Sequence, residues 1–184
     1  ETAPAPLSKA ETEENSVYPY TYVTCSQAQT LASKLSTGKS YTSSLMFGVQ
    51  WDLVLKHIET KIGSSNLTTS DEKNILTQDS SSWGNYYNAT FEYINSSGNT
   101  ATKNKDIGIR IPTGSAEYTK ANNIYDLSGN VLDWTMEAYD TNLRVLRGGL
   151  YDYTGTISPA DYRSYAHSTG SGDDLGCRSA LYIK

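Results

Sequence analysis

Two segments in the first third of the chain carry apolar residues at the spacing of an amphipathic helix. Ser26 is a suitable N-cap for the first helix, predicted over QAQTLASKL, and Gly38 is a typical C-terminal stop. The apolar stripe of that helix comprises Ala28, Leu31, Ala32 and Leu35. The stretch before it, VYPYTYVTC at residues 17–25, has β-forming residues in rough alternation and predicts a strand.

The second helix is predicted over SLMFGVQWDLVLKHIETKIG, residues 44–63, with Gly63 as its stop. Its apolar side comprises Val49, Leu53 and Ile58, and it is widened by Trp51 and Leu55.

The remaining two thirds of the chain favour strands and loops. Residues 64–106 are rich in Ser, Asn, Thr and Gly with islands of aromatics, which predicts loops and short strands. IGIRIPTG, residues 107–114, alternates and then reaches Pro112, so it predicts a short edge strand or the start of a loop. The main antiparallel strands are predicted near residues 130–136, 144–150 and 177–183. The fold class is therefore α+β, with two helices, a small sheet and long loops.

Composition and charge exclude several classes of function. The 184 residues suit one domain, and residues 1–16, which lack aromatics, predict a flexible linker or tail before a domain at residues 17–184. A net charge of −5 is a poor match for nucleic acid. No apolar run is long enough to predict a membrane span.

Cysteine, tyrosine and histidine usage adds three observations. Cys25 and Cys177 either form a disulfide or act as small buried apolar side chains. There are 15 Tyr and only 2 Phe, and Tyr suits binding surfaces because it combines contact area with a polar tip. His57 and His167 are the only imidazoles, and the sequence lacks the G-x-S-x-G, H-E-x-x-H and P-loop motifs. A Cys25–His57 pair has no further support, so His57 is more simply a surface or packing residue.

Five ordered motifs resemble the formylglycine-generating enzyme (sulfatase-modifying factor) family. They are FGVQWDLVLKHI, SWGN at residues 82–85, NIYDLSGNVLDWT at 123–135, RVLRGGLY and LGCRSALYI. The resemblance implies a variant of the C-type-lectin-like fold. The enzymes of the family use two cysteines shortly after the RGG element, where this chain has Tyr153 and Ser158, and Cys177 stands where the family has Phe. Neither Tyr nor Ser supplies a thiolate, so the chemistry of the family is not expected here.

Members of this fold class often bind calcium, which implies Asn130 and Asp133 as candidate oxygen ligands. The alternative is that Asn130 only forms the turn and Asp133 only meets an Arg. No other cofactor is expected.

The last third of the chain also resembles the variable proteins of diversity-generating retroelements. The shared anchors are Arg147-Gly148-Gly149, Pro159-Ala160 with Arg163, and Gly176 before Arg178-Ser179-Ala180-Leu181-Tyr182. Adenine mutagenesis of an AAY codon cannot yield Lys, Glu, Gln, Met or Trp, and none of these occurs between Leu150 and Gly176. The resemblance implies a variable region at about residues 150–176, called the 150–176 segment below.

Tyr151 and Tyr153 are predicted to share one face of a strand, and Tyr162, Ser164, Tyr165 and His167 to lie on the next irregular segment. Gly148, Gly149, Pro159 and Arg163 are predicted to hold the backbone. The predicted ligand-binding residues are Tyr151, Asp152, Tyr153, Thr154, Asp161, Tyr162, Ser164, Tyr165 and His167. The alternative is that these Tyr side chains simply pack.

The function favoured by these observations is a non-catalytic receptor or adhesin-type module with a protein or glycan ligand. It would belong to a larger surface or phage assembly and lie outside the cell, on a cell surface or on a phage particle. Two alternatives stay open: an oxidoreductase of the formylglycine-generating type, and a purely structural domain of a surface assembly.

Overall fold

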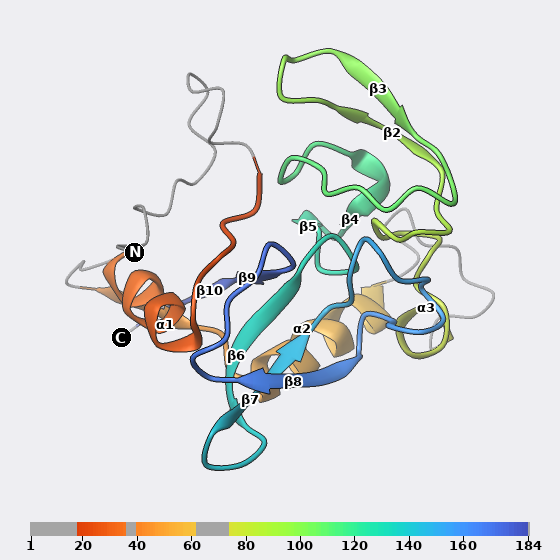
Figure 1. The fold of residues 1–184 in the computed structure, drawn as a ribbon. Helices are drawn as coiled ribbons and strands as arrows, with labels where there is room; N and C mark the ends of the chain where they lie inside the picture. Colours follow the sequence, from red (N-terminus) through yellow and green to blue (C-terminus); the bar gives the residue numbers. More distant parts are fainter. Residues whose placement is uncertain (1–17, 36–39, 62–73, 184) are drawn as a thin grey trace.

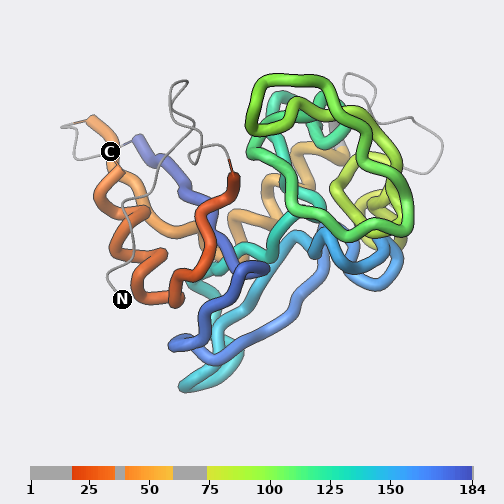
Figure 2. The backbone as a smooth tube through the Cα atoms, turned by 45° about the horizontal axis from the view of Figure 1, so that its top comes forward, coloured from red at the N-terminus to blue at the C-terminus, as the bar shows by residue number. Residues whose placement is uncertain are grey.

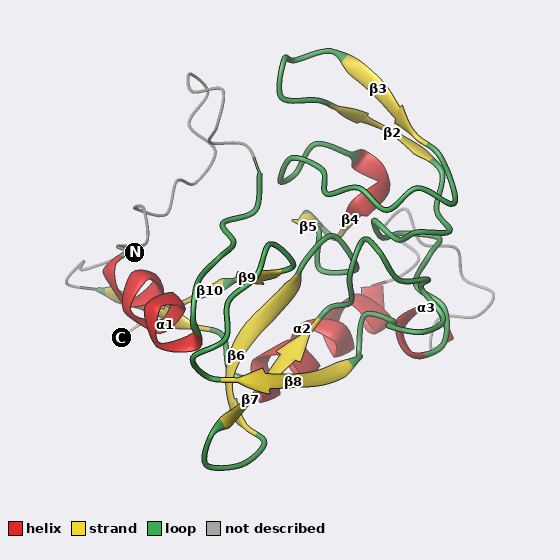
Figure 3. Cartoon of the chain, viewed as in Figure 1, coloured by secondary structure: helices red, strands yellow, loops and turns green. Residues whose placement is uncertain are grey.

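The computed structural model describes residues 18–35, 40–61 and 74–183. It has an α+β architecture in which a few helices flank small sheets and loops connect them (Figures 1 and 3). The predicted tail at residues 1–16 and the predicted stops at Gly38 and Gly63 lie outside the described residues. Within the described part, no helix has the length and apolar character needed to cross a bilayer.

Helix α1, Cys25–Lys34, begins before its predicted cap. Thr24 is the N-cap instead of Ser26, because the Thr24 hydroxyl accepts from the Gln27 N–H and the Gln27 side chain accepts from the Thr24 N–H. The strand predicted at residues 17–25 is wrong over its described part, residues 18–24. Tyr22 has a φ of 58°, in the left-handed region, and such a backbone cannot continue a strand ladder.

Helix α2, Gly48–Lys61, packs through a different face from the predicted one. Trp51, Leu55 and Ile58 are buried, whereas Val49 is 66% exposed and Leu53 is 64% exposed. Residues 51, 55 and 58 follow the i, i+4, i+7 spacing, so the buried Trp51 sets the face and turns Val49 and Leu53 to solvent. A one-turn helix, α3, follows at Asn74–Thr77.

The central sheet has four strands in the order β8-β7-β6-β9. Strands β6, Leu132–Ala138, and β7, Leu143–Arg147, lie near the predicted positions and are antiparallel. Strand β8, Arg163–His167, pairs antiparallel with β7 where an irregular segment was predicted, so that prediction is wrong. The last predicted strand is divided into β9, Leu175–Cys177, which runs parallel to β6, and β10, Ser179–Ile183.

The described residues also form three two-stranded sheets beside the four-stranded one. Strand β1, Tyr41–Leu45, pairs with β10. A hairpin formed by β2, Phe91–Ile94, and β3, Thr100–Lys103, lies at the opposite end of the molecule from α1 (Figure 2). The smallest sheet pairs β4, Lys120–Ala121, with β5, Ile124–Tyr125, after a 3-10 turn at Glu117–Thr119. Residues 107–112 form the start of a loop, one of the two predicted outcomes.

Three buried clusters hold these elements together, and each Trp anchors one of the two larger clusters. Trp51 and Trp83 lie in the cluster under α2, and Trp134 lies in the cluster between the central sheet and α1. All three indoles have 0% exposure. Each donates its ring N–H to a backbone carbonyl, namely that of Ala160, Ile75 or Val23 respectively, so these large side chains are buried without an unmet donor.

The two cysteines are free thiols, so the disulfide alternative is not formed. Both pack in or against the cluster beneath α1, as the alternative of small apolar side chains predicts. The Cys25 thiol lies 3.7 Å from the carbonyl oxygen of Thr135.

Candidate functional site

A turn at Ser128–Asn130 forms the base of the candidate site. Asn130 has a φ of 66°, as its turn role predicts. Its side-chain oxygen accepts from the backbone N–H of Ile111 and from the Asn85 amide, each at 3.1 Å, and its amide donates to the Ile111 carbonyl. The turn is thereby fixed to residues 85–89, which we call the support loop.

The RGG element begins at Arg147, the last residue of β7, and both of its glycines have left-handed backbone. Gly148 has a φ of 95° and Gly149 a φ of 84°. A Cβ at position 149 would lie 2.3 Å from the Ser158 carbonyl oxygen, and one at position 148 would lie 2.9 Å from the Trp51 ring. Both positions therefore require glycine for conformation and for space.

Hydrogen bonds to its backbone hold the first half of the 150–176 segment in place. Asn130 O accepts from Tyr151 N at 3.0 Å, and Tyr153 O accepts from Tyr87 N at 2.8 Å. Further along, Gly155 N donates to Asn88 Oδ1 at 3.1 Å. Around Pro159 the partners come from α2, α3, the loop after α3 and β7. Ser80 Oγ accepts from Ala160 N, and Trp51 Nε1 donates to Ala160 O. Leu76 O accepts from Asp161 N, and Arg147 donates to Asp161 O.

The side chains of the nine predicted binding residues are free of such bonds. Within the described part of the chain, none of them hydrogen-bonds to a residue outside the 150–176 segment. Thr154 bonds locally to Thr156, and His167 bonds locally to Thr169. Tyr153 is 43% exposed and Tyr165 is 52% exposed. The surrounding protein thus fixes the path of the backbone by hydrogen bonds and makes no hydrogen bond to these side chains within the described residues.

The nine residues do not share one face, and the predicted strand face for Tyr151 and Tyr153 is wrong. Tyr151 and Tyr153 lie in consecutive turns and not on a strand. Tyr151 and Tyr162 are half-buried against the cluster beneath α1, as the packing alternative predicts for them. Ser164 in β8 is half-buried.

The other β8 residues face the opposite way. Tyr165 and His167 are exposed on the side of the sheet that carries Arg163, because alternate residues of a strand point to opposite faces. Asp152, Tyr153 and Thr154 form a third group beside the support loop, and Asp161 is half-buried, with burial raising the pKa of its carboxyl.

Tyr139 is a surface residue that the sequence reasoning missed. It follows β6 and is 60% exposed, and its ring stacks on that of Tyr165 with centroids 4.2 Å apart and an interplanar angle of 17°. The pair extends the exposed aromatic surface beyond the 150–176 segment. The sequence signal for it was a Tyr within the turn-forming stretch EAYDTN, which indicates a surface position.

Arg163 has a structural contact through its side chain, in keeping with its predicted role. It donates to one carboxylate oxygen of Asp52 on α2 at 2.5 Å, and Arg147 donates to the other at 2.5 Å. Oε1 of Glu137, on β6, lies 3.6 Å from Nε of Arg163. Arg147 is fully buried, and burial, together with the neighbouring Arg163, lowers the pKa of its guanidinium.

The two calcium candidates have protein partners. Asn130 is bonded to Ile111 and Asn85, as described above, and Asp133 accepts from Arg178 at 3.3 Å. Burial raises the pKa of the Asp133 carboxyl. Among the described residues, no cluster of three or more His, Cys, Asp or Glu side chains is suited to a metal ion. The geometry adds no support to the calcium prediction, which stays untested.

The two positions that carry cysteines in the resembling enzymes lie in different environments here, and the two thiols of this chain lie elsewhere. Tyr153 is at the surface, whereas Ser158 has 0% exposure. Burial raises the pKa of the Cys25 thiol and raises that of Cys177 to about 12, so both stay protonated near neutral pH. His57 is exposed on α2 while Cys25 is buried under α1, so these two do not form a catalytic pair.

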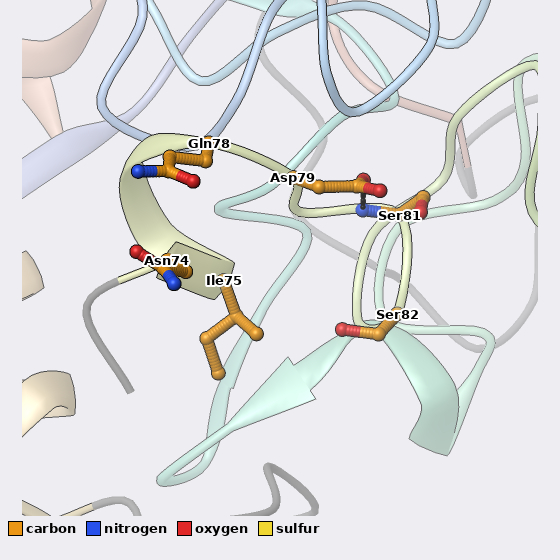
Figure 4. Close-up of a pocket in the computed structure, with 6 residues that line it drawn as sticks. All are labelled: Asn74, Ile75, Gln78, Asp79, Ser81 and Ser82. Atoms are coloured by element: carbon orange, nitrogen blue, oxygen red, sulfur yellow. Dashed lines mark hydrogen bonds between the residues drawn. The ribbon is translucent and has the colours of Figure 1, made fainter. Parts of the chain in front are cut away.

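A shallow cavity of about 290 Å³ lies beside the 150–176 segment. Gly155 closes one side, because a Cβ there would lie 2.3 Å from Ser81 N. Asp79 accepts from that same N–H at 2.9 Å (Figure 4). The lining residues are Asn74, Ile75, Gln78, Asp79, Ser81 and Ser82. The lining combines apolar surface with hydroxyl, amide and carboxylate groups, so the cavity offers both apolar and polar contacts.

Comparisons with known proteins agree with this geometry. The family described as sulfatase-modifying factor enzyme 1-like domain matches residues 3–183. No curated protein matches the chain. The solved structure of Treponema denticola variable protein 1 is 17% identical with a TM-score of 0.56, covering 96% of this chain and 75% of that one. The structure of CarF is 16% identical with a TM-score of 0.59, covering 96% of this chain and 71% of that one. The predicted fold, a formylglycine-generating-enzyme variant of the C-type-lectin-like fold, is confirmed.

Proposed function

The chain belongs to the sulfatase-modifying factor enzyme 1-like domain family, and we propose that it is a ligand-binding member of that family and not an enzyme. Its ligand is a protein or a glycan on another surface, and the module itself is displayed on a cell surface or a phage particle. The contact residues are carried by the 150–176 segment, whose side chains vary between copies of the gene through a diversity-generating retroelement.

The observation that carries the proposal is the division between backbone and side chain in that segment. Residues outside it bind its main chain from Tyr151 to Asp161. The side chains of Tyr153 and Tyr165 are exposed and make no hydrogen bond within the described residues. A support that recognises only backbone atoms accepts many side chains, and this is how binding loops are carried on rigid scaffolds.

The proposed contact surface comprises fewer residues than the nine predicted from the sequence, because only some of the nine side chains are exposed. Its exposed members form two groups, Asp152 and Tyr153 beside the support loop and Tyr165 and His167 on β8. Tyr151 and Tyr162 contribute only their exposed edges, since both also pack against the core. Tyr rings suit this task, because each presents a large rigid area at a low cost in conformational entropy.

The alternative of an oxidoreductase receives little support from the thiols. No cysteine lies in the 150–176 segment, and both cysteines are protonated and lie in the core. The alternative of a purely structural domain does not account for unbonded exposed Tyr side chains on a backbone that is so extensively held.

Sequencing the gene in many isolates of its source tests the proposal. We expect substitutions to concentrate at positions 152, 153, 165 and 167, and to be rare at Gly148 and Gly149. A near-identical template repeat and a reverse-transcriptase gene should lie nearby. Variation spread evenly over the chain, or no variation in the 150–176 segment across divergent isolates, would refute hypervariable display.

A further inference from the structure

Lys103, the last residue of β3, is a buried Lys whose ammonium is bonded to backbone carbonyls instead of a carboxylate. Its relative exposure is 0%. Its Nζ donates to the backbone carbonyls of Tyr86, Tyr87 and Ala89, at 3.1 Å to Tyr87 and 2.8 Å to Ala89. None of the ion pairs found between described residues includes Lys103. A buried ammonium without a carboxylate partner is costly unless its protons are all bonded.

The three carbonyls form an oxygen cage around that ammonium. An ammonium has three N–H donors and no acceptor, so it satisfies three convergent carbonyl oxygens at once. Convergent backbone carbonyls are also the oxygen ligands used to hold metal cations. An apolar side chain at position 103 would fill the space but remove one donor from each carbonyl: the Tyr86 and Tyr87 carbonyls would keep only the N–H groups of Ala89 and Asp106, and no other donor to the Ala89 carbonyl is found among the described residues.

All three carbonyls belong to the support loop, whose other side faces the 150–176 segment. Tyr87 N donates to Tyr153 O at 2.8 Å. Asn88 Oδ1 accepts from Gly155 N at 3.1 Å. Only one layer of backbone therefore separates the Lys103 ammonium from the turn that carries Asp152, Tyr153 and Thr154.

We propose that Lys103 is a positioning residue, whose ammonium is a built-in cation that fixes the support loop and, through it, the backbone at Tyr153–Gly155. The role of this contact in ligand binding rests on the proposed function, because a fixed backbone there orients the side chains that would bind ligand. The β2–β3 hairpin thus stabilises the backbone beneath the proposed contact residues, although it contributes no contact residue itself.

The test uses Lys103→Ala with n-propylammonium, which replaces the missing atoms from Cγ to Nζ. Amide hydrogen exchange is measured near pH 6.5, where the ammonium is intact, since burial lowers its pKa only to about 8. The reporters are the N–H groups of Tyr87 and Gly155, and the reference is Met136 N–H, which donates to Met46 O at 2.9 Å elsewhere in the fold. Lys105→Ala is the matched control, because Lys105 is exposed and lies two residues along the chain.

In Lys103→Ala we expect both reporters to exchange at least about tenfold faster while the Met136 N–H keeps its rate. Propylammonium should restore protection, whereas n-propanol, of the same size but neutral, should not. Unchanged reporters overturn the proposal. Equal rescue by propanol means that Lys103 only fills space, and equal acceleration at Met136 means that it supports global stability only. Either result also overturns the proposal.

A measurement on the unmodified protein covers the case in which Lys103→Ala does not fold. The Nζ protons of Lys103 should give an NMR signal that persists near pH 6.5, whereas those of exposed Lys105 exchange too fast to be seen. Absence of the Lys103 signal contradicts a fully bonded ammonium. Neither measurement uses ligand, so their outcome is independent of the sequencing test of the proposed function.

Discussion

Arg147 and Arg163 are direct cross-strand partners in the register of β7 and β8, so two like charges lie side by side. Such a pair is destabilising by itself. Asp52 on α2 resolves it by giving one carboxylate oxygen to each guanidinium, at 2.5 Å. The bridge joins α2 to the sheet at the two points where the 150–176 segment leaves β7 and enters β8.

Replacing Asp52 with Ala should cost much more stability than replacing Arg163 with Ala. The first change leaves the fully buried Arg147 without its counter-charge, which typically costs about 3–5 kcal/mol. The second removes a half-exposed partner, for which about 1 kcal/mol or less is expected. Urea unfolding of both single variants and the double variant measures the difference. Equal costs for the two single changes would show that Asp52 does not serve Arg147.

Stability should rise with pH across the titration of Lys103. Burial lowers its pKa to about 8, whereas a Lys in an unfolded chain titrates near 10.4. Between these values the unfolded chain holds a proton that the folded chain has released. The contribution of Lys103 to the free energy of unfolding therefore increases as pH rises. The difference in unfolding free energy between wild type and Lys103→Met, followed from pH 7 to 10, isolates this contribution. A flat difference would contradict the lowered pKa.

The protein should not convert the cysteine of a sulfatase-motif peptide to formylglycine. Tyr153 and Ser158 stand where the resembling enzymes have cysteines, and the thiols of Cys25 and Cys177 are buried and protonated. Mass spectrometry of the peptide after incubation with protein, copper and oxygen checks this. Conversion above that of a protein-free sample would restore the oxidoreductase alternative.

Tyr139 and Tyr165 should be energetically coupled. Their stacked rings predict a coupling of about 0.5–1.5 kcal/mol in a double-mutant cycle of Tyr139→Ala and Tyr165→Ala, measured by thermal unfolding. Tyr153→Ala paired with Tyr139→Ala is the control. Additive effects in the first cycle would show that the two rings only happen to lie close.

Much of the fold could be predicted because its signals are local. The Ser-Gly-Asn turn and the Gly148-Gly149 pair require left-handed backbone, which only a few residue types adopt readily, so sequence alone marks them. Strands β6 and β7 carry long β-forming runs. Strand β8 was missed because Arg163–His167 alternates between exposed and half-buried positions, and no apolar stripe distinguishes it from a loop.

The parts that could not be predicted depend on partners far apart in the chain. Asp52 and Arg147 are 95 residues apart, and nothing local indicates their pairing. The face of α2 was misjudged because several apolar residues lie on each side, and only the burial of Trp51 decides between them. Lys103 looks like any surface Lys until the support loop folds over it.

The central claim is that the surrounding protein fixes the backbone of the 150–176 segment and leaves its exposed side chains free. The most direct test compares the free energies of unfolding of two variants. One replaces Asp152, Tyr153, Tyr165 and His167 together with Ser, and the other is Gly149→Ala. The first removes four exposed side chains, for which about 0.5 kcal/mol each is the usual limit, apart from the lost Tyr stack.

The second variant adds one methyl group, at a φ of 84° and 2.3 Å from the Ser158 carbonyl oxygen. Strained backbone and forced displacement together predict a cost of about 2 kcal/mol or more. We expect that, once the Tyr139–Tyr165 stacking energy from the double-mutant cycle is subtracted, the single methyl costs more stability than the four side chains combined. A fourfold variant that unfolds, or whose loss after that subtraction exceeds the loss in Gly149→Ala, would contradict the claim.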